Sequence, residues 1–302
     1  MYSSITESVL ASPQHPRKSA QIRIRSIAVA VLVVLTVAAC TAPIQSSPSA
    51  EVVDCAQRGP GANLKGCDLR GADFSGLDFT GATFDEANLV GANFSKAVLT
   101  TTSFVDANLA SANLTSASAE SADFQSAQLS DALLVEGTFT DANFALSNCS
   151  SSDMSRGVFD GANFNNAALT YAHATDALFV GAKFNIANLA NTKLSQADFS
   201  KAEMTRATLT NADIQNSNFQ GALLRYANLR FTLLWGADFS RADLRDASIY
   251  QSYEAGKSGA AIIFRSADLR GTQMDGFYEF YVADSRGAKL LGALMPNGTT
   301  HP

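Results

Sequence analysis

The most reactive side chains are a few cysteines and histidines. The cysteines are Cys40, Cys55, Cys67 and Cys149, and the histidines are His15, His173 and His301. The histidines lie too far apart in the sequence to have the spacing of a metal site, so we expect no metal. The sequence also lacks a Ser-His-Asp order, a nucleophile elbow and a glycine-rich phosphate loop. We therefore expect neither an enzyme nor a cofactor.

The segment before Cys40 is typical of a secretory signal. The apolar run IAVAVLVVLTVA begins at Ile27 and contains no charge. Four basic residues precede it: Arg17, Lys18, Arg23 and Arg25. About twelve apolar residues are too few for a stable membrane-spanning helix, which needs roughly twenty. The sequence predicts a signal peptide over residues 1–39, with an uncleaved anchor as the alternative.

The apolar run ends in Val-Ala-Ala-Cys, with Cys40 last. This ending resembles the lipobox of bacterial lipoproteins, in which the cysteine becomes the lipidated first residue of the mature protein. Residues 40–54 are rich in Ser, Pro and Ala, which is typical of a flexible tether. The resemblance implies a protein anchored by lipid at Cys40 on the extracytoplasmic face of the cell membrane.

Beyond the tether, a large side chain returns at every fifth position from Leu64 to Ile249. We call this the central position; together with Phe264, which falls in the same frame, it holds 16 of the 19 phenylalanines, and alanine usually stands two residues before it. Neither a helix, with a period near 3.6, nor a strand, with a period of 2, repeats in this way. The chain must therefore turn a corner every five residues, with the central residue and the alanine inside. Clear central residues are Phe84, Leu89, Phe104, Leu109, Phe144, Phe164, Phe184, Leu189, Phe199 and Phe239.

The unit Ala87-Asn88-Leu89 and its many copies resemble the pentapeptide-repeat proteins. The resemblance implies an all-β fold, a right-handed quadrilateral β-helix over residues 55–275, with four five-residue faces in each of roughly eleven coils. A twenty-residue period supports it, since columns of phenylalanine alternate with aliphatic columns. On this period Phe264 should follow Leu244, and Leu269 should follow Ile249. Paired strands lie about 4.8 Å apart, which is the spacing expected between coils.

The two ends of such a solenoid need caps. At the N-terminal end, Cys55 and Cys67 either form a disulfide, as is common outside the cytoplasm, or remain independent thiols. Cys149 lies four coils above Cys67, about 19 Å away, whereas a disulfide needs Cα atoms within about 7 Å. We therefore expect Cys149 to replace a leucine in the core.

The repeat is interrupted near residues 250–263, where we expect a loop that is either a tolerated bulge or a binding element. After Met274 the frame shifts by one residue. The expected late central positions are Phe280, Ser285, Leu290 and Met295. Residues 276–302 then form a C-terminal cap and tail, in which Phe277, Tyr278, Phe280 and Tyr281 have the bulk to close the interior. The alternative use of this end is a homodimer interface, because members of the family often dimerise there.

Charge is distributed unevenly along the chain. Residues 41–224 contain nine basic and nineteen acidic residues, and no Lys or Arg lies between Ala97 and Ser155. The net charge of -6 argues against nucleic acid as a partner. In the remaining segment, Arg225, Arg245 and Arg265 recur every twenty residues and should stack on one face, near Tyr226 and Trp235. This face is a candidate for binding an anion or an acidic partner; a solvated face balanced by Asp246 and Asp268 is the alternative.

These features favour a non-catalytic extracytoplasmic lipoprotein that acts as a rigid scaffold or as a module binding an unknown protein or envelope polymer. The alternative is a DNA-mimicking pentapeptide-repeat protein that binds DNA gyrase and confers quinolone tolerance, which would require that the chain is not exported.

Overall fold

The computed structural model describes residues 53–250, 261–277, 280 and 283–302. The predicted signal peptide, Cys40, most of the predicted loop, Tyr278 and Tyr281 lie outside the described residues. Within the described residues there is no α-helix and no continuous strand; pairing consists of single-residue bridges. This part of the chain accordingly contains no helix of the length and apolar character needed to cross a membrane.

Each five-residue unit ends in a tight turn. In the first coil the amide of Cys67 donates to the carbonyl of Leu64 at 3.1 Å. The third residue of this turn, Gly66, has a φ of 68°, which is the left-handed conformation that a type II turn requires at that position. Glycine adopts it without strain, and the same position in later units holds residues such as Glu86, with a φ of 58°. The turns are the corners of the coil.

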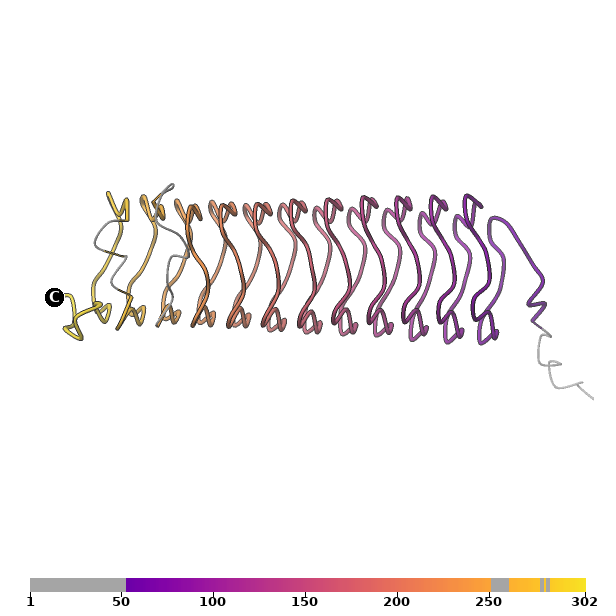
Figure 1. The fold of residues 1–302 in the computed structure, drawn as a ribbon, viewed down its shortest axis with the longest axis horizontal. Helices are drawn as coiled ribbons and strands as arrows, with labels where there is room; N and C mark the ends of the chain where they lie inside the picture. The colour runs from indigo at the N-terminus through magenta and orange to yellow at the C-terminus, as the bar shows by residue number, and fades with distance from the viewer. Residues whose placement is uncertain (1–52, 251–260, 278–279, 281–282) are drawn as a thin grey trace, which may run out of the picture. The chain divides into compact units, whose positions relative to one another are not determined.

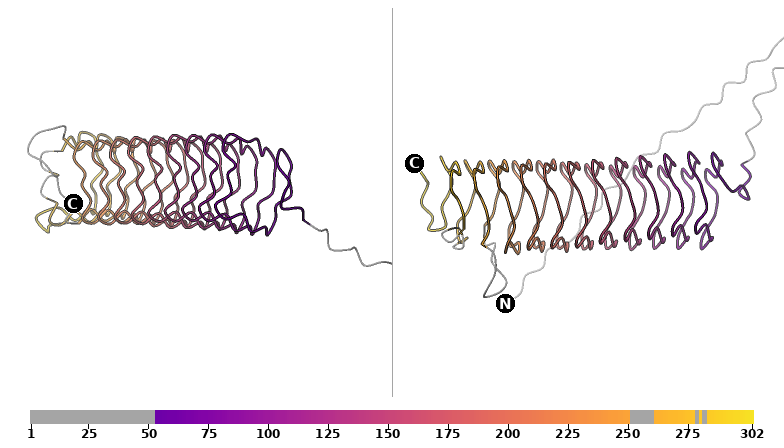
Figure 2. Two further views of the ribbon diagram at one scale, coloured as in Figure 1. Left: turned by 45° about the vertical axis from the view of Figure 1, so that its right-hand side comes forward. Right: turned by 90° about the horizontal axis from the view of Figure 1, so that it is seen from above.

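Parallel bridges join residues that are twenty apart. The first four are Asn63 to Thr83, Asp68 to Asn88, Asp73 to Asn93 and Asp78 to Val98. Four bridges in twenty residues give each coil four sides. Backbone hydrogen bonds connect the coils, as between the amide of Leu64 and the carbonyl of Thr83 at 2.7 Å. Figures 1 and 2 show the resulting stack, in which successive coils lie side by side along one axis.

The central residues and the small residues two places before them fill the interior. All ten of the central residues named above are buried, with at most 1% of each exposed. From Phe104 to Phe184 five phenylalanine rings stack coil upon coil, with centroids 4.7–4.9 Å apart. This distance is the spacing of paired strands, so backbone pairing and ring stacking have the same period. Cys149 is buried in the core, where desolvation raises the pKa of its thiol to about 12.

The predicted columns are wrong above Ile249. Asp238 pairs with Ile263 and Asp243 with Asp268, so this step is twenty-five residues long. Phe264 consequently stacks on Phe239, at 5.4 Å between ring centroids, and does not follow Leu244. The interruption adds five residues, the length of one side. The five-residue frame therefore survives while every later column moves by one side.

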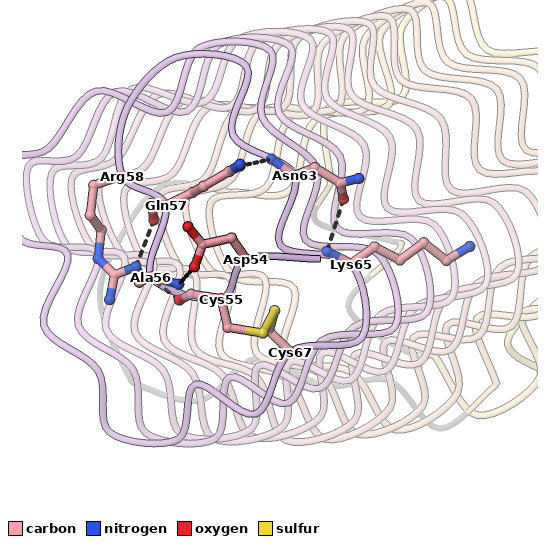
Figure 3. Close-up of a disulfide and its surroundings, with 8 residues drawn as sticks. All are labelled: Asp54, Cys55, Ala56, Gln57, Arg58, Asn63, Lys65 and Cys67. Atoms are coloured by element: carbon pink, nitrogen blue, oxygen red, sulfur yellow. Dashed lines mark hydrogen bonds between the residues drawn. A yellow bond between two sulfur atoms is a disulfide. The ribbon is translucent and has the colours of Figure 1, made fainter. Parts of the chain in front are cut away.

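A disulfide between Cys55 and Cys67 closes the N-terminal end (Figure 3). The side-chain oxygen of Gln57 accepts a hydrogen bond from the amide of Asn63 at 2.8 Å. In the next coil the equivalent amide, that of Thr83, donates to the carbonyl of Ala62 in the coil below. No coil of the described chain lies below Asn63, and the side chain of Gln57 supplies the missing acceptor. The guanidinium of Arg58 lies 4.9 Å from the ring centroid of Phe74 and covers part of the core at this end of the column.

The C-terminal end is covered by the chain itself. Ile263 pairs with Asp284 and Gln273 with Leu294, steps of twenty-one residues that confirm the predicted shift of frame. Thr300 then forms an antiparallel bridge with Leu294, and the amide of His301 donates to Ala293 at 2.8 Å. Pairing of this kind occupies an edge that would otherwise recruit another chain. A dimer through this end stays a prediction.

Candidate binding surface

Three positions of every unit face outward, and the corner residue, two places after the central one, protrudes most. Asn, Asp, Ser and Gly suit the left-handed backbone at this position. Two corners instead hold exposed aliphatic residues: Leu146 is 58% exposed with a φ of 62°, and Ile186 is 56% exposed with a φ of 64°. For a β-branched residue such as Ile186 this conformation is an outlier. Neither burial nor backbone preference explains these two side chains.

The cost of the left-handed corner can be measured at Gly181. A side chain there meets nothing within 4 Å, so only backbone strain opposes it. We expect Gly181→Ile to lower the free energy of unfolding by about 1–2 kcal/mol, as measured by urea denaturation. Gly181→Asn should cost less, because asparagine tolerates this backbone. Equal losses in the two variants would contradict a backbone origin.

The predicted arginine ladder is only partly assembled. Arg225 and Arg245 occupy equivalent positions in successive coils, but the twenty-five-residue step places Arg270, and not Arg265, above Arg245. Arg265 lies on another corner and pairs with Asp284 at 2.5 Å. Trp235 is ten residues from Arg225, half a coil, and therefore lies on the opposite side. The five residues proposed from sequence do not form one face.

Most of the nearby arginines are already neutralised by carboxylates in a pattern that recurs in the sequence. When Asp precedes the central residue and Arg follows it, the two side chains form a bidentate pair on the outer wall. This occurs at Asp68 and Arg70, Asp243 and Arg245, Asp268 and Arg270, and Asp284 and Arg286, with the closest N–O distances at 2.5–2.7 Å. The signal Asp-x-Arg in frame with the central position identifies these pairs.

Arg225 is the exception, because Leu223 stands where the pattern requires Asp. Its Nε is buried and has no hydrogen-bond partner among the described residues. The guanidinium lies 5.5 Å from the ring centroid of Tyr226, and that of Arg206 lies 5.8 Å from the same ring. No carboxylate of the described chain forms an ion pair with Arg206 or Arg225. Two uncompensated guanidinium groups therefore flank one exposed tyrosine.

The paired carboxylates make the last coils sensitive to acid. Arg286, and then Arg265, hold the pKa of Asp284 well below its usual range, and Arg245 lowers that of Asp243. A carboxyl whose pKa is lowered by folding stabilises the protein above its unfolded pKa of about 3.9, and this is lost as pH falls through the folded value. Amides of residues 284–294 should exchange faster between pH 4 and pH 2, after correction for intrinsic rates. Asp284→Asn should flatten this profile; an unchanged profile would contradict the assignment.

The surface also contains a shallow pocket. Arg230, Tyr250, Gln273 and Asp275 line this pocket, in which the guanidinium of Arg230 lies 4.8 Å from the ring centroid of Tyr250. No group of three or more His, Cys, Asp or Glu side chains within the described ranges is arranged to hold a metal ion.

A four-sided coil with a five-residue unit, a filled interior and polar corners defines a β-helical solenoid of pentapeptide repeats. The chain matches the family "Pentapeptide repeats" in eight copies. These matches cover residues 62–100, 92–127, 102–141, 122–161 and 222–252. Residues 152–231 match the related "Pentapeptide repeat region". The chain belongs to the pentapeptide repeat family.

Solved structures of the same family are similar to this chain. HetL, a pentapeptide repeat protein involved in heterocyst differentiation regulation from the cyanobacterium Nostoc sp. strain PCC 7120, is 25% identical, with 82% of this chain and 95% of that chain covered and a TM-score of 0.36. QnrB1, a plasmid-mediated fluoroquinolone resistance protein, is 14% identical, with 67% and 88% covered and a TM-score of 0.42. No curated protein sequence matches the chain.

Proposed function

We propose that this protein is a non-catalytic lipoprotein, anchored through Cys40 on the extracytoplasmic face of the membrane, that acts as a rigid scaffold or binding module. In this proposal its folded part is a right-handed quadrilateral β-helix of roughly eleven coils, capped at both ends. The partner is an unknown protein or envelope polymer, and it contacts the outer walls.

The disulfide between Cys55 and Cys67 is the observation that carries this proposal. Disulfides persist in oxidising compartments and are rare in the cytoplasm. This one lies shortly after Cys40 in the sequence and joins the end of the predicted tether to the first coil. A covalent cap at this place suits a column whose N-terminal end is attached to a membrane.

The filled interior supports the scaffold role. Ligand sites are normally concave, whereas the central residues here occupy the interior with their own side chains. The regular pairing of backbone between coils also gives a stiff column. Recognition would then use charge, hydrogen bonding and apolar contact on the outer walls.

Metabolic labelling with an alkyne fatty acid tests the anchor. We expect the full chain to incorporate the label and to fractionate with membranes, and we expect Cys40→Ala to lose the label completely. Cys149→Ala removes a buried cysteine and should leave labelling unchanged. An unlabelled parent chain that stays in the cytoplasm, with Cys55 and Cys67 present as thiols, would overturn the proposal.

The acidic stretch between Ala97 and Ser155, without Lys or Arg, favours the second candidate function, binding of DNA gyrase by a DNA mimic. This candidate requires a cytoplasmic chain. It predicts that the purified protein inhibits supercoiling by gyrase at stoichiometric concentration, and a lack of inhibition would exclude it.

A further inference from the structure

Along one corner of the column, the sign of the exposed charges changes from one end to the other. This corner, which we call the charged edge, consists of the two residues that follow each central residue in the column that begins at Leu64, and parallel bridges align it from coil to coil. Apart from Lys65 its N-terminal part is acidic, apart from Asp246 its C-terminal part is basic, and exposed aliphatic residues lie between them. The residues that define it are Asp85, Glu86, Asp106, Leu146, Ile186, Arg206 and Arg225.

The charged edge is complementary to itself when it is reversed about Asn166. Leu146 and Ile186 lie one coil on either side of Asn166, so each would meet the other across a two-fold axis. Three coils from Asn166, the turn of Val105 and Asp106 would face the turn of Arg225 and Tyr226. One coil further out, Asp85 and Glu86 would face the turn of Arg245 and Asp246, so this outer contact combines opposite and like charges. Opposite charges and apolar side chains meet in the same register.

The groups at the inner positions lack partners within the molecule. Leu146 and Ile186 are more than half exposed on left-handed corners, as described above. The exposed carboxylate of Asp106 has no ion-pair or hydrogen-bond partner among the described residues, and Arg225 has no carboxylate. Arg245, by contrast, is already held by Asp243, and Glu86 by Lys65 at 3.0 Å, so the outermost contacts add less.

We propose that the charged edge is the interface of an antiparallel homodimer, with its two-fold axis at Asn166. An interface between identical chains that is closed by a two-fold axis must be self-complementary, because residue i contacts residue j and j contacts i. A parallel pair would instead place Asp106 against Asp106 and Arg225 against Arg225. The antiparallel arrangement places Leu146 against Ile186 and Asp106 against Arg225, whereas Arg206, two coils from Asn166, faces the polar residues Gln125 and Ser126.

A cysteine on the two-fold axis tests the geometry. In purified full-length protein, Asn166→Cys places two thiols opposite each other, and mild oxidation should convert most of the protein to a disulfide-linked dimer on a non-reducing gel. Asp176→Cys is the matched control, since it is an exposed corner residue half a coil away, on the opposite side of the column. Equal crosslinking of both variants, or of neither, would overturn the proposal.

A charge exchange tests the pairing and separates it from misfolding. In the Asn166→Cys background, Asp106→Arg and Arg225→Asp should each reduce the yield of crosslinked dimer at least several-fold, because each places like charges across the interface. The variant with both exchanges should restore the yield. The pairing is wrong if either single variant gives as much crosslinked dimer as the Asn166→Cys protein alone. It is also wrong if the variant with both exchanges does not recover the yield of crosslinked dimer.

This inference does not depend on the lipid anchor. Failure of the crosslink with fatty-acid labelling intact would remove the dimer alone, and the reverse result would remove the proposed localisation alone. Crosslinks confined to cysteines placed at the C-terminal end would assign the dimer to the cap instead and would also overturn the proposal.

Discussion

Replacement of Phe144 by alanine is expected to lower the free energy of unfolding by about 3–5 kcal/mol. The ring is fully buried and stacks between those of Phe124, at 4.8 Å, and Phe164, at 4.7 Å. Truncation removes both stacking contacts and leaves a cavity that the paired coils cannot close, because backbone hydrogen bonds fix their separation. Equilibrium denaturation with urea, followed by circular dichroism, measures the loss.

Leu146→Ala is the matched control for this variant. It lies two residues from Phe144, in the same unit, but it is exposed at the corner. Its removal should change the free energy of unfolding of the monomer by no more than about 0.5 kcal/mol. Similar losses at Phe144 and Leu146 would contradict an inward Phe144 and an outward Leu146.

Removal of the disulfide is expected to lower the free energy of unfolding by about 3 kcal/mol, as the chain-entropy estimate for a loop of this length gives. The loss arises because the unfolded chain gains freedom and because residues 53–60 are released from the first coil. Cys67→Ala is the suitable variant, since alanine occupies the equivalent position at Ala62 and leaves no strain. Urea denaturation measures the stability, and hydrogen exchange should show the loss of protection in the first coil.

Reductant provides the control for this second variant. It should destabilise the parent by the same amount as Cys67→Ala and should leave the variant unchanged. Cys149 will not complicate the comparison, because it is buried and its thiol is hardly ionised at neutral pH. A parent chain that is insensitive to reductant would show that the cap is held by other contacts, such as that between Gln57 and Asn63.

The five-residue frame, the inward direction of the central residues and the twenty-residue coil could all be predicted from sequence. Each depends on a local rule that repeats: a turn every five residues, a large side chain inside and a small one two places before it. Phe104 and Phe124 face the same environment, so the pattern reinforces itself in every coil. The same period excluded Cys149 as a disulfide partner of Cys67 but left open whether Cys55 and Cys67 are bonded.

The relations between neighbouring coils across the interruption were decided by the tertiary structure. The position of a residue within its five-residue unit decides whether its side chain points inward. The side of the coil on which the residue lies depends on its position within the twenty-residue coil. An added segment of five residues leaves the frame intact and moves Arg265 to another corner. Asp284 likewise pairs with Arg265 of the neighbouring coil, about 4.8 Å away, as well as with its sequence neighbour Arg286. Contacts made along the chain repeat locally, whereas contacts made between coils depend on the number of residues in every turn of the solenoid.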